Sequence, residues 1–213
     1  SSALGGVIPI EGGLVVDLGA LHRILEFNPG DEFVRVECGL EWRRLVGYLA
    51  ERGFEPGANA SSGVSATIGG YLGTGGGAGI GVPARGVLGD QVLSLKLALA
   101  DGRIVETNPW ESQLFTGAEG TLAAILEATL KVFPLPPRRH GMLAFGDLGE
   151  GIAAYRTIEA MRPYYLHFLD RGAVGFLNRM GGTWHDAAAT IGYVLEGPEA
   201  LLAAREQEIA ALP

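Results

Sequence analysis

The sequence predicts an α+β fold in which one large domain precedes a smaller lobe. Residues 33–38 alternate apolar and polar side chains, as a half-buried strand does, and apolar residues three and four positions apart predict a helix at 42–52. A proline-rich run at 134–139 can continue neither a strand ladder nor a helix, so it marks a boundary. Beyond this boundary the pattern changes to strand, helix, strand, strand, helix.

The larger domain is expected to hold several further short elements. The apolar run Leu14–Leu18 predicts a buried strand. Leu93–Leu99 alternates leucine with smaller or polar residues, and the Asp101-Gly102 pair predicts a tight turn into a return strand at 103–107. The remaining elements are a short helical turn capped by Asn108 with Pro109 at its first position, and a strand at 128–133.

Beyond the boundary the predicted elements form a smaller lobe. They are a strand at 142–145, a helix at 150–161, a strand at 164–169, an irregular stretch, a strand at 190–195 and a helix at 199–212. This succession is that of a ferredoxin-like sandwich that lacks its last strand. The sequence therefore predicts a domain over residues 1–133, a linker over 134–140 and a partial lobe over 141–213.

Composition excludes several classes of protein. The 213 residues are 47% hydrophobic and carry a net charge of −8, so a packed core is available and a nucleic-acid platform, which needs a basic face, is not expected. No apolar run is long enough for a membrane span, and we expect no signal peptide. The single cysteine, Cys38, excludes an intramolecular disulfide and fits a reducing cytoplasm. It lies on the apolar side of its strand, so we interpret it as a small core residue. No histidine or carboxylate cluster has metal-ligand spacing.

Glycine is the unusual residue, with 34 of 213 positions, thirteen of them between Gly53 and Gly89. We refer to residues 53–89 as the glycine-rich segment. Apolar residues interleave with these glycines, which a flexible linker would lack. Main-chain amides freed of side chains can converge on an anion, and Arg85 is the one basic residue in the segment. Neither the P-loop nor the Rossmann fingerprint occurs, so a nucleotide cradle and a structural glycine-rich corner both remain open.

Several sequence blocks resemble one family of flavoproteins. They are Asn59-Ala60-Ser61-Ser62, Thr67-Ile68-Gly69-Gly70, Arg85-Gly86 with Asp90, Leu99-Ala100-Asp101-Gly102, and the block from Phe115 to Leu130 that contains Gly117-Ala118-Glu119-Gly120-Thr121-Leu122. Their order and spacing over about residues 5–133 resemble the FAD-binding module of the vanillyl-alcohol-oxidase type. Within that family, the chain looks most like the FAD-containing subunits of glycolate oxidase and the D-2-hydroxyacid dehydrogenases.

The resemblance implies two FAD-holding subdomains, the second complete here and the first truncated, followed by a partial ferredoxin-like substrate lobe. It implies non-covalent FAD, because the N-terminal loop has no histidine and Cys38 lies away from the positions at which the family attaches flavin. The flavin contacts that carry over are Gly5, Gly6, Ala58, Asn59, Ala60, Ser62, Thr67, Ile68, Gly69, Gly70, Gly75, Gly76, Gly77, Gly79, Glu119, Gly120 and Ile125.

The FAD diphosphate carries two negative charges, which main-chain donors can bind without a buried lysine. This agrees with a glycine-rich segment whose one basic residue is Arg85. For three of these family positions, a structural role is the alternative to a flavin contact. Thr67 is interpreted as a ligand contact in preference to a purely structural residue. Glu119 is equally well a turn residue, and Arg85 is equally well part of an ion pair that braces a loop.

The chain offers few residues for chemistry. In the family, a 2-hydroxy acid gives a hydride to the flavin while a base takes the hydroxyl proton. The candidate bases are His140, His167 and His185, and the candidate partners of a substrate carboxylate are Arg138, Arg139 and Arg171. For each of them a surface or core role is the ordinary interpretation. The family's later histidine-rich segment has no counterpart, so the catalytic residues stay unassigned.

The resemblance implies an FAD-dependent oxidoreductase subunit that oxidises a small 2-hydroxy acid such as glycolate. Its electrons would pass to partner subunits or another acceptor, because the chain lacks iron–sulfur cysteines. We expect a cytoplasmic protein, associated with a membrane only through a partner. The alternative is a non-catalytic accessory subunit that binds flavin weakly or not at all. A flavin reductase of cell-wall precursor synthesis shares the module, but its serine or cysteine acid and its glutamate are not evident here.

Overall fold

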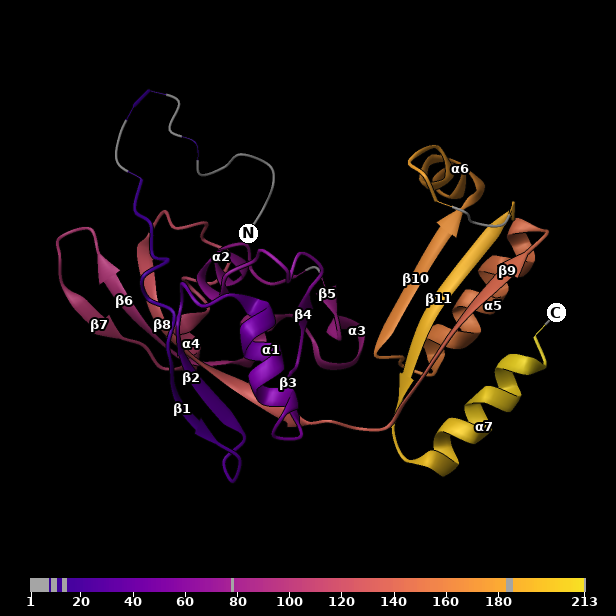
Figure 1. The fold of residues 1–213 in the computed structure, drawn as a ribbon, viewed down its shortest axis with the longest axis horizontal. Helices are drawn as coiled ribbons and strands as arrows, with labels where there is room; N and C mark the ends of the chain where they lie inside the picture. The colour runs from indigo at the N-terminus through magenta and orange to yellow at the C-terminus, as the bar shows by residue number, and fades with distance from the viewer. Residues whose placement is uncertain (1–7, 9–10, 13–14, 78, 183–185, 213) are drawn as a thin grey trace. The chain divides into compact units, whose positions relative to one another are not determined.

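The computed structural model describes residues 8, 11–12, 15–77, 79–182 and 186–212. The chain divides into two compact units, Ser1–Leu135 and Pro136–Pro213 (Figure 1). The division falls inside the segment 134–140 that was expected to be a linker. Both units mix helices with antiparallel strands, so the predicted α+β class is confirmed. In the described part of the chain, no helix combines the length and the apolar character that crossing a membrane requires.

The first unit is built on an antiparallel sheet. In spatial order its strands are β1 (Ile24–Asn28), β2 (Phe33–Glu37), β8 (Ala123–Pro134), β6 (Val92–Leu99) and β7 (Ile104–Glu106), and β3 (Phe54–Pro56) pairs with β8 off this path. The long strand β8 therefore pairs with three neighbours and organises the sheet. Successive side chains on a strand point to opposite faces, so each strand divides its residues between two surfaces.

Two helices bury one face of this sheet. Helix α1 (Trp42–Ala50) contributes Leu45 and Leu49 to the core, and helix α2 (Ile68–Gly73) contributes Ile68 and Leu72. They pack with inward-facing strand residues that include Val34, Val36, Leu95, Leu97, Ala128 and Leu130. Cys38 lies in the same core with 1% of its surface exposed, as its place on the predicted strand indicated.

Short elements complete the first unit. They are β4 (Asn59–Ala60), β5 (Gly79–Ile80), α3 (Val82–Arg85), the 3₁₀ helix η1 (Leu88–Gln91) and α4 (Pro109–Ser112). Strands β4 and β5 pair with each other within the glycine-rich segment. At α4, the Asn108 side chain accepts hydrogen bonds from Trp110 and Glu111 amides while the Glu111 carboxylate accepts from the Asn108 amide. This capping box confirms the predicted helix start.

The locally encoded elements of the first unit were predicted correctly. Strand β2 and helix α1 lie where the periodicity placed them, and Gly53 follows α1 with a left-handed φ of +76°. Strands β6 and β7 form the predicted hairpin, with Gly102 at φ +84° in its turn. In each case the signal is a short-range pattern that tertiary contacts do not oppose.

The predicted strand at Leu14–Leu18 was wrong over its described residues. Leu14 lies outside them, and residues 15–18 have no strand pairing, with Val15 and Val16 64% and 63% exposed. The sheet's edge strand is instead β1, which pairs with β2 and was not predicted. An apolar run can become a strand only where a neighbouring strand offers hydrogen bonds, and this run has none.

The second unit is built on a small sheet of three strands. Its elements are β9 (Arg138–Phe145), α5 (Leu148–Ala160), β10 (Tyr165–Asp170), α6 (Arg171–Arg179), β11 (Ala189–Glu196) and α7 (Glu199–Ala210). The sheet is antiparallel in the order β10-β11-β9. Helices α5 and α7 share a core with one sheet face through Ala154, Ile158, Leu202 and Ile209. Helix α6 lies against β10, and the pocket described below places it over the other face.

Two expectations for the second unit need correction. Residues 138–140, expected in the linker, begin strand β9, where Arg138 lies opposite Glu196 and the two side chains form a 2.9 Å ion pair. The stretch expected to be irregular contains α6, which begins where the Asp170 carboxylate accepts a hydrogen bond from the Ala173 amide. Two glycines within α6 lower the helix propensity of this segment, so the sequence does not indicate a helix clearly. In the structure the Asp170 cap and the burial of the apolar side of α6 outweigh that low propensity.

Close packing of α5 on the sheet gives a test of the fold. A Cβ on Gly151 would overlap the Cβ of Ala189, whereas a Cβ on Gly175 of α6 would meet only Arg179 Nη1 at 3.7 Å. We expect Gly151→Ala to lower the free energy of unfolding by about 1–3 kcal/mol. The matched Gly175→Ala change should raise it by about 0.5–1 kcal/mol, because alanine favours helix. Urea unfolding followed by circular dichroism measures both changes, and a stabilising Gly151→Ala would contradict the packing.

Candidate functional site

Helix α2 begins inside the glycine-rich segment and is anchored by its first turn. The Thr67 hydroxyl caps it by accepting a hydrogen bond from the Gly70 amide at 3.3 Å. The Ile68 amide donates to the Leu40 carbonyl at 3.0 Å, and the Gly69 amide donates to the Cys38 carbonyl at 2.7 Å. These donors are therefore engaged by the protein itself, and Thr67 has a structural role whether or not it also contacts a ligand.

Three of the glycines predicted to contact flavin are placed tightly by the packing of the chain on itself. A Cβ on Gly69 would lie 3.0 Å from Cys38 Cβ, and one on Gly76 would lie 2.5 Å from Leu88 Cβ. A Cβ on Gly79 would overlap the Asn59 carbonyl oxygen across the β4–β5 pair. The structural interpretation of the glycines therefore holds at these positions.

The pair β4–β5 is held in place by an aromatic cluster. The Trp42 indole N–H donates to Asn59 Oδ1 at 3.0 Å, and the Trp42 and Tyr71 rings meet edge to face at 5.0 Å between centroids. Ala58 and Ala60 are buried beside this cluster, while Ser62 is exposed. The Asn59 side chain is thus fixed by α1 rather than left free to turn toward solvent.

The far end of α2 meets the loop formed by residues 117–120. The Gly117 amide donates to the Leu72 carbonyl and the Glu119 amide donates to the Gly73 carbonyl, both at 2.9 Å. Gly75 (φ +81°), Gly117 (φ +80°) and Glu119 (φ +51°) all adopt left-handed backbone. Two blocks that the sequence separates by about forty residues therefore form one continuous main-chain surface.

This surface is bare of side chains at its centre. A Cβ on Gly73 or on Gly120 would meet no atom within 4 Å, and one on Gly75 would meet only Gly117 Cα at 3.6 Å. Gly73 was not among the predicted contacts, because its place after an apolar helical pair gives no ligand signal. Ile125, another predicted contact, is buried in β8 opposite Leu97.

Arg85 takes part in an ion pair that braces the segment. Its guanidinium lies 2.6 Å from a Glu55 carboxylate oxygen, with 11% and 6% of the two side chains exposed, and it stacks on the Phe133 ring at 4.6 Å. Next to it, the Gln91 amide group donates to the Arg85 and Gly86 carbonyls at 3.3 and 3.2 Å. The bracing alternative for Arg85 is therefore present in the structure.

The other predicted residues are placed as follows. Gly5, Gly6 and the candidate base His185 lie outside the described residues. His140 and His167 are exposed on β9 and β10. Arg138 pairs with Glu196 and stacks on Tyr164, Arg139 lies 2.7 Å from Glu199, and Arg171 lies 3.4 Å from Asp186. Each arginine thus has a carboxylate partner from the second unit itself.

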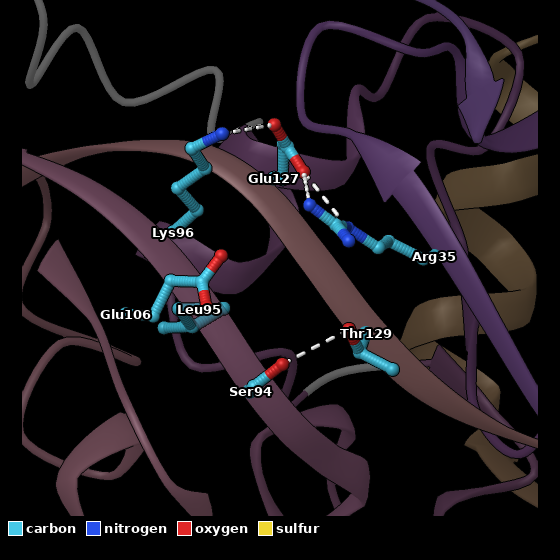
Figure 2. A pocket seen from close by; sticks show the side chains of 7 residues that line it. All are labelled: Arg35, Ser94, Leu95, Lys96, Glu106, Glu127 and Thr129. Carbon is cyan, nitrogen blue, oxygen red and sulfur yellow. Dashed lines mark hydrogen bonds and ion pairs between the residues drawn. The ribbon is translucent and has the colours of Figure 1, made fainter. Parts of the chain in front are cut away.

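A charged cluster that sequence reasoning missed lies on the sheet of the first unit (Figure 2). The Glu127 carboxylate of β8 accepts hydrogen bonds from Arg35 of β2 at 2.6 and 2.9 Å and from Lys96 of β6 at 3.0 Å. Burial by itself raises the pKa of Glu127, but the hydrogen bonds from Lys96 and Arg35 outweigh it, and the pKa lies below its ordinary value. The cluster joins three strands, and the cross-strand register is the signal that could have revealed it.

The Cys38 thiol has no part in chemistry. Burial raises its pKa above the ordinary value of a thiol, and the nearby Glu127 charge adds to the effect. The thiol therefore stays neutral, which agrees with its interpretation as a core residue.

Comparison with known proteins identifies the family. A model described as "FAD binding domain" matches residues 1–108, just over half of the 213-residue chain. The chain belongs to this family of FAD-binding flavoproteins, the PCMH type, and its cofactor is FAD. The predicted resemblance is thereby confirmed.

Individual relatives show how much of a longer protein the chain covers. Glycolate oxidase subunit GlcD of Bacillus subtilis is 31% identical over 78% of this chain and 38% of its own length. A probable mitochondrial D-lactate dehydrogenase of Danio rerio is 32% identical over 88% of the chain and 40% of its own length. A solved alkyldihydroxyacetonephosphate synthase matches the whole chain and 44% of its own, with a TM-score of 0.82 and 18% identity, which is a likeness of fold. The chain thus spans about 40% of the length of these curated relatives.

The described residues fit the family's cofactor at one place. A dinucleotide can approach main chain closely where glycines have open space, and Gly73, Gly75 and Gly120 provide it. The left-handed turns around them include Gly75, Gly117 and Glu119, whose amides donate to carbonyls of the protein itself.

The depressed pKa of Glu127 predicts a pH-dependent stability. A carboxyl whose pKa is lowered on folding contributes stability above its unfolded pKa and loses it as pH falls through the folded value. We expect Glu127→Gln to cost about 1 kcal/mol at pH 7, a modest figure because Arg35 and Lys96 are 39% and 34% exposed. The cost should shrink below about pH 4. Thermal unfolding across pH measures this cost, and Glu106→Gln beside the same charged cluster is the control. A cost of Glu127→Gln that does not change with pH would contradict the lowered pKa of Glu127.

Proposed function

We propose that the glycine-rich segment and the 117–120 loop together hold the dinucleotide part of FAD. The observation that carries this proposal is the join between them, in which Gly117 and Glu119 amides donate to the carbonyls at the end of α2. The join leaves Gly73 and Gly120 with open space on a surface that contains no side chain at either position. A diphosphate seated there can approach the main chain closely, because neither glycine carries a side chain.

Each neighbouring residue then has a defined task. Glu119 is exposed, and its carboxylate is available to accept hydrogen bonds from ribose hydroxyls. Gly75 supplies the left-handed turn after α2, and Gly77 is exposed beside it. Asn59, fixed by Trp42, keeps the β4–β5 pair at the edge of the surface. Gly69, Gly76 and Gly79 act indirectly, by letting the chain pack closely enough to form this surface.

The activity we assign to the whole protein is oxidation of a small 2-hydroxy acid. It is supported by similarity to a glycolate oxidase subunit and to a probable D-lactate dehydrogenase. FAD in such a protein supplies the acceptor for a hydride from the substrate carbon. Transfer of the electrons to a partner subunit is supported by the likeness to a protein named as a subunit.

One observation favours an accessory subunit as the second candidate. Arg138, Arg139 and Arg171, the side chains considered for a substrate carboxylate, all have carboxylate partners within the second unit. A subunit that keeps the fold and binds flavin without turning over substrate is consistent with these pairings.

A matched pair of helical glycines tests the flavin site. Gly73→Leu places a side chain in the open space over α2, and we expect FAD affinity to fall at least about tenfold. Gly47→Leu makes the same change in α1, where a Cβ also meets no atom within 4 Å, and should leave affinity unchanged. Both variants should keep or slightly raise stability, since leucine favours helix over glycine.

Quenching of flavin fluorescence on titration with protein measures FAD affinity, and circular dichroism confirms folding. Equal affinity in wild type and Gly73→Leu would remove this surface from the site.

A turnover assay separates the two candidate functions. With FAD bound and an artificial electron acceptor present, the enzyme should oxidise glycolate or D-lactate and reduce the acceptor. The assay is run on the chain alone and on the complex recovered with native partners. Saturating FAD without turnover in either preparation would select the accessory subunit.

A further inference from the structure

The face of the second unit's sheet opposite α5 and α7 contains a pocket of about 420 Å³. Residues from all three strands form its floor, among them Met142 of β9 and Tyr165, His167 and Leu169 of β10. Phe176 and Leu177 of α6 form a wall. The volume falls within the range of about 300–1,000 Å³ that is usual for small-molecule sites.

Most of the side chains that line the pocket are apolar, and Tyr165, His167 and Thr190 add polar groups. Along β10, Leu166 and Phe168 pack into the core with α5, so the alternate residues 165, 167 and 169 face the pocket. Met142 and Phe176 remain 58% and 55% exposed at its rim. None of the described lining residues is a lysine, arginine, aspartate or glutamate. A ligand would therefore place an apolar body here.

Gly192 opens the floor of the pocket. It lies in the central strand β11, directly opposite His167 on one side and Met142 on the other. A Cβ on Gly192 would meet no atom within 4 Å, whereas one on Gly141 of β9 would be blocked by the Tyr193 ring. Packing thus explains why position 141 is glycine but does not explain why position 192 is. Glycine weakens a strand, so its presence at position 192 needs another reason. The residue leaves free the space that a ligand body would use.

One corner of the pocket carries a polar pair. The Tyr165 hydroxyl and His167 Nδ1 lie 2.7 Å apart in a hydrogen bond. If the hydroxyl donates to a neutral ring, the other ring nitrogen keeps its proton; if the ring donates, the hydroxyl keeps its own. When the ring is protonated, both nitrogens donate. In every state the pair retains a donor for a ligand oxygen, and in the two neutral states it also retains an acceptor.

We propose that this pocket binds an organic acid with an apolar tail, its carboxylate at the Tyr165–His167 pair and its tail over Gly192. The apolar lining selects the tail, and the hydrogen-bond donor selects an oxygen head group. Binding at this pocket does not depend on the proposed flavin site, which lies in the first unit.

Calorimetric titration of the flavin-free chain with acetate, butanoate, hexanoate and octanoate tests the proposal. We expect affinity to rise about fourfold per added methylene, because each one removes apolar surface from water. Octylammonium has a comparable tail with a cationic head and should bind at least about tenfold more weakly than octanoate. Absence of octanoate binding, or equal binding of octylammonium, would overturn the proposal.

Variants assign the binding to this pocket. Gly192→Val should weaken octanoate binding about tenfold and flatten the dependence on tail length, while a β-branched residue in a strand keeps the fold. Gly146→Val is the control, since a Cβ there also meets no atom within 4 Å and the residue does not line the pocket. His167→Leu should reduce the preference for octanoate over octylammonium.

Gly73→Leu should bind octanoate as the wild type does, which separates this result from the test of the flavin site. Unchanged octanoate binding by Gly192→Val would place the acid elsewhere and refute the proposal.

Discussion

The contact between Gly69 and Cys38 sets how closely helix α2 approaches the sheet of the first unit. The Gly69 amide donates to the Cys38 carbonyl at 2.7 Å, and a Cβ on Gly69 would lie only 3.0 Å from Cys38 Cβ. With this end of α2 held, Ile68 and Leu72 reach the core and the other end meets the 117–120 loop. The main-chain surface assigned to FAD therefore depends on a contact that lies outside it and that leaves little room for a side chain at position 69.

The glycines of the first unit divide into two groups with different physical roles. Gly69, Gly76 and Gly79 have neighbours that exclude a Cβ, so they allow close packing of the chain. Gly73 and Gly120 have open space and leave main chain accessible. The two readings of the glycine-rich segment, structural corner and nucleotide cradle, are therefore compatible, because different residues serve each. Gly192 repeats the second role in the other unit, at the floor of an apolar pocket.

Charged side chains of the first unit mainly hold its strands and loops together. Arg85 pairs with Glu55, Arg23 with Glu37, and Arg35 and Lys96 with Glu127. The cations are thus engaged by the protein's own carboxylates, in a chain of net charge −8. An anionic cofactor at the glycine-rich segment would consequently rely on main chain that it can approach closely where glycines leave open space, with no desolvated cation needed.

The sequence by itself determined the α+β class, strand β2, helix α1, the β6–β7 hairpin, the capped α4 and the family, because each rests on short-range patterns or motif spacing. Helix α2 was not evident, since three of its six residues are glycine, which has a poor helix propensity. Burial of Ile68, Tyr71 and Leu72 outweighs the poor propensity of these glycines. The join of Gly73 with Glu119 and the pocket over Gly192 were likewise decided only by the tertiary structure. They depend on contacts between residues far apart in the chain, and local sequence does not encode which of those contacts form.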